Sequence, residues 1–436
     1  MIHCSICESS DWLNVDEYRL KPIGMALCKK CGFVTYPEIV GRSEELKEFY
    51  REEYRPAPTV QNVFTGQRKL HYHSEFLKDL MEEWKKEGRK PAVFEVGCAF
   101  GMFLDWFRRN FPEASLGGSE LTLAFRRNAH EEYHIEPSEH FDDSKQYDVI
   151  ASYKVAEHIP GIEKELRRYA LALKPVGFLY ISVPTWFHTM SNFGMDGFSL
   201  DYYYDKNHVN VWTRKLFETL LRKCGLEVVK KNTVYYDATY LCRRNDEVMK
   251  VEPEYDDPTV ILSHLHNIKK AAMAFDDGDF EMALRYFPAF PDAHVGAYEK
   301  KRAEWHGKGY PAIHEEVLKR AMAACPESSK MTFFSAEVSM RYDQWPQALE
   351  YLKLALKQKP NDPGALQAIG HCYRQMAERA QKPEEKVKLY TEARDVTRHL
   401  QQVSFQHAHD AVTWIFADNA KIPMPGELNG TTPGVG

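Results

Sequence analysis

The amino-acid sequence predicts an α/β protein with an open, doubly wound sheet, a small cysteine-rich module before it and an all-α region after it. Three observations carry this prediction. Short apolar segments alternate with helical ones between residues 91 and 245, four cysteines form two close pairs before residue 40, and apolar residues recur with a period of 34 further on. The length of 436 residues corresponds to about three domains.

The composition is that of a folded chain, with 44% hydrophobic and 13% aromatic residues. Lysine and arginine number 57 and acidic residues 63, so the net charge of -6 gives no basic excess that would indicate nucleic acid or an anionic membrane as partner. The sequence has no apolar run of about 18 residues and no amino-terminal signal peptide. We therefore expect a cytoplasmic protein that neither inserts into a membrane nor binds nucleic acid.

The cysteine-rich module, residues 1–40, is predicted to be a zinc ribbon. It contains two Cys-x2-Cys pairs with twenty residues between them. Each pair can place two thiolates on one tight turn, and two pairs supply the tetrahedral sulfur shell of a closed, structural Zn2+ site. The predicted ligands are Cys4, Cys7, Cys28 and Cys31. His3 is an alternative to one thiolate, and the other cysteines are dispersed, as small buried side chains are.

Residues 41–90 are expected to form a helical connector between the ribbon and the sheet. Helices are predicted over residues 44–54 and 67–87, the second ended by a glycine and a proline. We expect the connector, through the aromatic segment 50–54, to cover the ligand pocket of the sheet.

The sheet is predicted to begin with a buried strand at residues 93–96, which leads into a tight turn and then a helix. Gly97 lets the chain reverse without a Cβ clash, and Gly101 lets the backbone approach a ligand at the helix N-terminus. A second strand, residues 115–120, ends on Glu120, whose carboxylate can accept both hydroxyls of a ribose. The Gly-x-Gly-x-x-Gly fingerprint of dinucleotide oxidoreductases is absent, which disfavours that class.

The remaining strands follow the same alternation. They are expected at residues 147–153, 173–184, 226–229 and 234–241. A helix is predicted over residues 214–223, with Thr213 as its N-cap and Gly225 beyond its end.

Taken in order, these motifs resemble those of class I S-adenosylmethionine-dependent methyltransferases over residues 91–245. The matching segments are 95–101, 118–120, 147–150, 157–159 and 173–177. The resemblance implies a Rossmann-like seven-stranded methyltransferase sheet and methyl transfer from S-adenosyl-L-methionine. The candidate cofactor-binding residues are Glu95, Gly97, Cys98, Gly101, Glu120 and Tyr153, with Glu120 placed on the ribose.

The sequence departs from the family pattern in two places. The first loop carries Cys98, Ala99 and Phe100 where a middle glycine is usual. The acidic residue that usually flanks the adenine is not identified among Glu136, Glu139, Asp142 and Asp143.

Glu157, His158 and His208 are the candidate catalytic residues. A hydroxyl or carbon acceptor must lose a proton, and a histidine or carboxylate at the carboxyl edge of an open sheet suits that task. A structural role for Glu157 and His158, capping and packing the next helix, is an equal alternative. The aromatic segment 186–204 is either a lid over the acceptor or a small satellite core.

The last third of the chain is predicted to be helical. Residues 246–260 have the acidic, proline-containing composition of a linker, and residues 261–420 are expected to form a tetratricopeptide-like domain. The period of 34 is carried by Leu318, Ala321 and Pro326, which recur as Leu352, Ala355 and Pro360. Such arrays usually hold another protein or a second copy of the chain, and a helical cap that stabilises the enzyme is the alternative. Residues 421–436 are predicted to be disordered.

The sequence therefore predicts a methyltransferase that acts on a small molecule or glycan. Family members with an N-terminal cysteine-rich zinc module often act on sugars, so the resemblance implies a sugar nucleotide or glycan acceptor, methylated on oxygen or, as second choice, carbon. One alternative is a macromolecular acceptor, either protein presented by the repeats or RNA held by the ribbon; the acidic charge argues against RNA. Another is a scaffold that binds the cofactor without turnover, against which the presence of Gly97, Gly101 and Glu120 argues.

Overall fold

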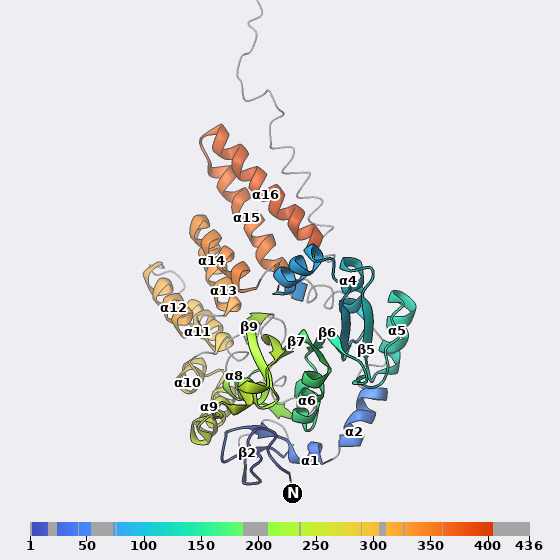
Figure 1. Cartoon of the computed structure of the whole chain (residues 1–436). Helices are drawn as coiled ribbons and strands as arrows, with labels where there is room; N and C mark the ends of the chain where they lie inside the picture. Colours follow the sequence, from blue (N-terminus) through green and yellow to red (C-terminus); the bar gives the residue numbers. More distant parts are fainter. Residues whose placement is uncertain are drawn as a thin grey trace, which may run out of the picture. The chain divides into compact units, whose positions relative to one another are not determined.

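The computed structural model describes residues 2–15, 24–41, 43–53, 73–74, 76–185, 208–234, 237–288, 290–304, 311–325, 328–359 and 361–403. The chain divides into two compact units on either side of Phe287 and Pro288 (Figure 1). The aromatic segment 186–204, the predicted tail 421–436 and part of the connector lie outside the described residues. No described helix combines the length and apolar composition that a bilayer crossing requires.

The first unit is built on a mixed α/β sheet, which confirms the predicted fold class. The strands run in the order β5-β4-β6-β7-β10-β9. Their bounds are β4 (Ala92–Val96), β5 (Ser115–Ser119), β6 (Tyr147–Tyr153), β7 (Leu173–Val183), β9 (Leu226–Val234) and β10 (Asp237–Arg244). The first four strands of this order are parallel, and β10 is antiparallel to both of its neighbours. The helices between them are α4 (Met102–Asn110), α5 (Leu123–Tyr133), α6 (Ile162–Ala172) and α8 (Arg214–Lys223).

Local sequence explains these elements well. The apolar side chains of β6 are buried, as expected for a parallel strand covered on both faces. Helix α8 has the predicted bounds: the Thr213 side chain accepts a hydrogen bond from Leu216 N at 3.1 Å, and Gly225 after its end has a φ of 74°.

The sheet contains six strands in the described part of the chain, where the resemblance implied seven. Between α5 and β6 the place of a further strand is taken by a single parallel bridge of Ser138 to Ser119. The bridge consists of two hydrogen bonds, Ser138 N to Gly118 O at 2.9 Å and Glu120 N to Ser138 O at 3.0 Å. Ser138 supplies both the donor and the acceptor of this bridge, so the pairing there is one residue long.

A second, antiparallel sheet joins the amino-terminal module to the rest of the unit. Its order is β1 (Trp12–Asn14), β2 (Ala26–Cys28), β3 (Val34–Thr35) and β8 (Asn210–Val211). The first three strands belong to the module, whereas β8 lies directly before α8. Phe33 of the module stacks on Trp212 with ring centroids 6.3 Å apart. The module and the α/β sheet therefore share one hydrophobic core.

The module ends with the short helix α1 (Pro37–Val40). The connector begins with α2 (Ser43–Glu48) and η2 (Phe49–Glu53), and residues 76–86 are helical. The segment expected to be a linker contains a short 3-10 helix, η5 (Asp246–Lys250), and packs on α8: Lys215 pairs with Asp256 at 3.1 Å. Helices α9 (Pro258–Asp276) and α10 (Phe280–Tyr286) follow and belong to the first unit.

The second unit consists of helices that pack in chain order (Figure 1). They are α11 (Pro291–Glu304), α12 (Pro311–Ala324), α13 (Ser329–Arg341), α14 (Trp345–Gln358), α15 (Pro363–Arg379) and α16 (Pro383–Val403). Helices α14 and α15 begin 34 residues after α12 and α13, respectively, so the period found in the sequence is a period of helix pairs. Leu318 and Leu352, which share one repeat position, are both buried.

Candidate functional site

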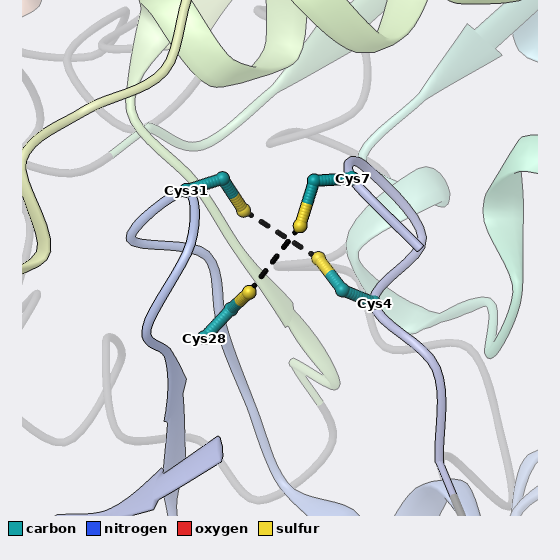
Figure 2. Close-up of side chains that lie close together, drawn as sticks. All are labelled: Cys4, Cys7, Cys28 and Cys31. Carbon is teal, nitrogen blue, oxygen red and sulfur yellow. Dashed lines mark hydrogen bonds between the residues drawn. The ribbon is translucent and has the colours of Figure 1, made fainter. Parts of the chain in front are cut away.

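The four predicted zinc ligands converge at one point of the ribbon. Figure 2 shows the four sulfur atoms directed toward a common centre, Cys4 and Cys7 from one turn and Cys28 and Cys31 from the other. The Sγ atoms of Cys4 and Cys31 lie 3.5 Å apart, and those of Cys7 and Cys28 lie 3.4 Å apart. Sulfurs around a tetrahedral zinc ion are about 3.8 Å apart, so a small expansion of this cluster fits the ion.

The electrostatics of the cluster favour a metal cation. The neighbouring thiols of Cys31, Cys4 and Cys7 hold the pKa of Cys28 far below its ordinary value, because they can donate hydrogen bonds to its thiolate. All four side chains are buried. A buried thiolate among three thiols is the donor set that Zn2+ binds by displacing protons. His3 has its Nδ1 3.3 Å from Glu8 O, and the four-cysteine group does not include it.

The glycine turn between β4 and α4 has the geometry that a closely bound ligand requires. Gly97 has a φ of +67°, and a Cβ there would lie 2.4 Å from Val155 Cγ2. Gly101, with a φ of +80°, is the N-cap residue of α4. Ala99 between them has a φ of 44°, which is costly for a residue with a Cβ. The turn is therefore held in a left-handed backbone conformation at the start of a helix, the place where anionic or nucleoside ligands commonly bind.

Glu120 is fixed beside this turn by the backbone. Its Oε2 accepts a hydrogen bond from Ala99 N at 3.0 Å, and its Oε1 accepts one from Thr122 N at 2.8 Å. Burial raises the pKa of this carboxyl, and the backbone hydrogen bonds oppose that rise. Each oxygen keeps a lone pair for a further donor, such as a ribose hydroxyl.

Glu95 lies in the interior of the sheet with an unsatisfied oxygen. Its Oε2 is buried, and no group in the described residues donates a hydrogen bond to it. Burial, and secondarily the charge of Glu120, raise the pKa of Glu95 well above its ordinary value. Two neighbouring buried carboxylates near a glycine turn form a site that a cationic ligand would neutralise.

The other two predicted cofactor residues have different surroundings. Cys98 is buried, and a Cβ placed on Gly118 would lie 3.0 Å from its Sγ, so its side chain packs behind the turn against β5. Tyr153 ends β6 and donates a hydrogen bond to Asp237 Oδ2 at 3.4 Å.

The three candidate catalytic residues come together although the sequence separates His208 from the other two by fifty positions. The short helix η3 (Ala156–His158) follows β6 and carries Glu157 and His158, and His208 precedes β8. The ligand atoms of the three side chains all lie within 4.8 Å of one another. The rings of His158 and His208 are 4.8 Å apart, and His158 Nε2 is 3.9 Å from Glu157 Oε1.

The connector covers this cluster. Tyr50 Oη and His158 Nδ1 form a hydrogen bond of 2.8 Å, and Thr122 Oγ1 donates to Tyr50 O at 2.8 Å. Tyr50 thus bridges Thr122, beside Glu120, and His158, beside Glu157. With Nδ1 engaged by Tyr50, the other ring nitrogen of His158 is the one that faces Glu157 and His208.

A buried ion pair adjoins the cluster. Lys154 follows β6 with a φ of 54°, and its Nζ lies 3.1 Å from Asp237 Oδ2 at the start of β10. Burial, then His158 and then Lys154 lower the pKa of His208 well below its ordinary value, so His208 is neutral at neutral pH. Two histidines and a carboxylate are also a possible donor set for a divalent cation, but the Lys154 ammonium opposes a second positive charge here.

Sequence reasoning missed His73, which lies on the connector and is buried. Its Nδ1 is hydrogen-bonded to Tyr180 Oη of β7, and its ring contacts that of Tyr153 with centroids 4.1 Å apart. Burial, and then the charges of Asp237 and Glu95, raise the pKa of Tyr180 well above its ordinary value. The only signal in the sequence was a histidine inside an amphipathic helix, which does not distinguish a site residue from a core residue.

The fold and the site define the class of this protein. An open α/β sheet with a glycine turn, an acidic residue at the end of the next strand and polar side chains on its carboxyl edge is typical of enzymes that bind a nucleoside-type cofactor. Residues 67–231 match the sequence model of a family described as a methyltransferase domain. The chain therefore contains a methyltransferase domain over these residues.

Solved structures of methyltransferases resemble the chain in fold. The plantazolicin methyltransferase BpumL in complex with SAH is 13% identical; the match covers 48% of this chain and 99% of BpumL, with a TM-score of 0.36. An O-methyltransferase family protein from Burkholderia thailandensis is 16% identical over 48% of this chain and 68% of its own, with a TM-score of 0.33. A complex of the Haloferax volcanii Trm112 methyltransferase activator and a methyltransferase is a third match. The identity is 13%, the match covers 40% of this chain and 94% of the other chain, and the TM-score is 0.31. A comparison with curated proteins finds no match.

Proposed function

We propose that the chain transfers the methyl group of S-adenosyl-L-methionine to a hydroxyl of a sugar nucleotide or glycan-type acceptor, with a carbon acceptor as second choice. The observation that carries this proposal is the cluster of Glu157, His158 and His208 at the carboxyl edge of the sheet. The donor is already activated, so the protein has to supply orientation, exclusion of water and, for a hydroxyl or carbon acceptor, removal of a proton.

The cofactor is proposed to lie along the glycine turn. Gly97 and Gly101 would face it with their backbone, Glu120 would accept its ribose hydroxyls, and Glu95 would take a hydrogen bond from its ammonium group. The buried, unsatisfied Oε2 of Glu95 is the observation that fits this cofactor. Cys98 and Tyr153 would contribute packing from behind the turn and from the end of β6. The sulfonium donor supplies the methyl group.

His158 is the proposed proton acceptor. Its hydrogen bond to Tyr50 orients the ring, and Glu157 lies 3.9 Å from its Nε2, where a carboxylate stabilises the imidazolium that forms. His208 is a neutral imidazole at neutral pH because of its burial, and it is proposed to orient the acceptor hydroxyl by a hydrogen bond. An amine or thiolate acceptor would need less of this machinery, and for that reason we favour oxygen.

The carbohydrate class rests on the amino-terminal module, because family members with such cysteine-rich modules often act on sugars. We propose that this module, residues 1–40, binds one structural Zn2+ through its four cysteines. The proposed arrangement continues with the connector to residue 90, the catalytic domain to 245, a linker to 260 and a tetratricopeptide-like domain to 420. The helix pairs of that domain are proposed to bind a protein partner or a second copy of the chain.

The test is incubation of the purified chain with methyl-labelled donor and fractionated cell extract. Label in small sugar nucleotides or glycans supports the proposal. Label in protein or RNA would replace it with the macromolecular alternative, and no label in any fraction would favour a binding scaffold.

The catalytic assignment is tested with His158→Asn. We expect methyl transfer to fall about 100-fold or more, the range of a lost general base, while cofactor binding by calorimetry is unchanged. His140→Asn is the matched control, because the His140 side chain is 73% exposed and should leave transfer unchanged. Equal transfer by the two variants would remove His158 from the mechanism.

A further inference from the structure

The strand that follows His208 is completed by the ribbon. In the antiparallel pairing of β3 with β8, Val34 lies opposite Val211 and Thr35 opposite Asn210. The Thr35 hydroxyl donates a hydrogen bond of 2.6 Å to Val209 O, the carbonyl next to His208 in the chain. Thr35 and Val209 are both buried.

The same short segment is also held by the helix that carries the proposed base. The Asn210 side-chain amide donates to Ala156 O and to Ile159 O, both at 2.8 Å. These two carbonyls flank Glu157 and His158 in the chain. Residues 209–211 are thus bonded both to the ribbon and to the segment that contains η3.

The ribbon edge that pairs with this segment is set by the cysteine turn. Cys28 N donates to Phe33 O at 2.8 Å, and Gly32 N donates to Cys28 O at 2.9 Å. These bonds close the turn that carries Cys28 and Cys31, and β3 begins three residues after Cys31. Any change that opens the turn therefore moves β3 and the strand paired with it.

We propose that Thr35 is a positioning residue for His208, and that the four-cysteine site controls the placement of His208 through β3 and β8. The ribbon then helps to position an active-site residue and is not a separate docking module. This inference rests on the proposed function in taking His208 as part of the acceptor site. Beyond the proposed function, we expect that metal bound to the ribbon regulates the acceptor site through β3 and β8, without contact to the cofactor.

The experiment measures the accessibility of His208 in the full chain, which requires no acceptor. Diethyl pyrocarbonate acylates exposed neutral imidazoles, and mass spectrometry gives a rate for each histidine. His208 is 5% exposed and should react slowly, whereas His130, whose side chain is 61% exposed, serves as the internal reference. Hydrogen exchange of the amides of residues 208–213 gives a second reading of the same segment.

Three variants separate the proposal from general destabilisation. Thr35→Val keeps the side-chain shape and removes the hydroxyl. We expect the acylation rate of His208, relative to that of His130, to rise about tenfold, because the loss of one buried hydrogen bond makes local opening of the segment about tenfold more frequent. Thr35→Ser restores the donor and should return the rate to that of the unaltered chain. Lys29→Ala changes an exposed residue of the cysteine turn, paired with Asp11 at 2.8 Å, and should leave His208 protected.

Removal of metal from the unaltered chain with a chelator should expose His208 as Thr35→Val does, while S-adenosylmethionine binding by calorimetry stays within twofold. Unchanged protection of His208 in Thr35→Val, or equal rates in Thr35→Val and Thr35→Ser, would overturn the proposal. The proposed function fails by a different result: if His208→Asn transfers methyl groups at the normal rate, His208 is not part of the acceptor site, whatever holds it in place.

Discussion

The substitution Glu95→Gln should stabilise the cofactor-free protein and weaken cofactor binding at once. Glu95 is 8% exposed, and its Oε2 is buried with no hydrogen-bond donor among the described residues. Burial, and then the charge of Glu120, raise the pKa of this carboxyl well above its ordinary value. The folded chain therefore binds a proton at Glu95 that the unfolded chain has released.

The sign of the pH effect follows from this shift. Because the folded-state pKa is the higher one, the contribution of Glu95 to stability is fully present below the unfolded pKa and is lost as pH rises through the folded pKa. Glutamine mimics the protonated form at every pH. We expect the free energy of unfolding of Glu95→Gln to exceed that of the unaltered chain by about 1 to 2 kcal/mol at pH 8, with the difference vanishing near pH 4.

Cofactor binding should change in the opposite direction. A charge-assisted hydrogen bond to the ammonium group contributes about 1.5 to 3 kcal/mol, so Glu95→Gln should weaken S-adenosylmethionine binding about 10- to 150-fold. In the unaltered chain the affinity should rise with pH, because only the ionised carboxylate pairs with the cation. Titration calorimetry at pH 6 and pH 8, in two buffers of different ionisation enthalpy, would also detect the proton released on binding.

Asp148 provides a matched control on the neighbouring strand β6. It is a buried carboxylate as well, but its Oδ2 accepts from Ala92 N and from Lys174 Nζ, both at 2.7 Å. Asp148→Asn should destabilise the chain and leave cofactor affinity unchanged. If Glu95→Gln instead destabilised the chain at pH 8 and bound the cofactor normally, Glu95 would be a structural residue and the reasoning would be refuted.

Three further predictions follow from the same geometry. Glu120→Ala should weaken S-adenosylmethionine binding about 100-fold by calorimetry, since it removes the carboxylate proposed for the ribose, and an unchanged affinity would disprove that assignment. Gly97→Ala should lower the free energy of unfolding by about 3 kcal/mol, because its Cβ would lie 2.4 Å from Val155 Cγ2 at a φ of +67°. Gly161→Ala is the control, since Gly161 has a φ of +68° but nothing within 4 Å, and it should lower the free energy of unfolding by about 1 to 2 kcal/mol. Equal losses in the two variants would exclude the clash. Cys28→Ser should abolish the zinc content measured by mass spectrometry, whereas Cys224→Ser, at a buried cysteine outside the cluster, should retain one ion per chain.

Local sequence was sufficient where local forces decide the structure. The bounds of β6 and α8 follow from a buried apolar run and from a threonine cap with a glycine stop. Glu157 and His158 were expected at the carboxyl edge of the sheet, because they directly follow a strand there. That His208 joins them was not predicted, since its place depends on how β8 pairs in the tertiary fold. The roles proposed for these residues stay predictions until the variants are measured.

Contacts between segments that are distant in the chain left no pattern in the amino-acid sequence from which they could be predicted. The pairing of β3 with β8 joins residues about 175 positions apart through two residues of each strand, which is too short for any periodic pattern. The ion pair of Lys154 with Asp237 and the bond of His73 to Tyr180 are likewise fixed only by the tertiary fold. The single bridge at Ser138 in place of a full strand is likewise visible only in the tertiary structure.

The buried charged residues form two groups, of which one consists of two carboxylates and the other contains an ion pair. On the side of the glycine turn, burial raises the pKa of both Glu95 and Glu120, and the charge of Glu120 raises that of Glu95 further. On the acceptor side, burial disfavours the charge of Lys154, but Asp237 overcomes this and raises its pKa, so that half is already balanced within the protein. A ligand with positive charge therefore gains most at the turn, and a neutral hydroxyl gains most beside His158 and His208. In the proposed function, this asymmetry would orient a sulfonium donor and an uncharged acceptor group toward each other before any contact specific to the acceptor is made.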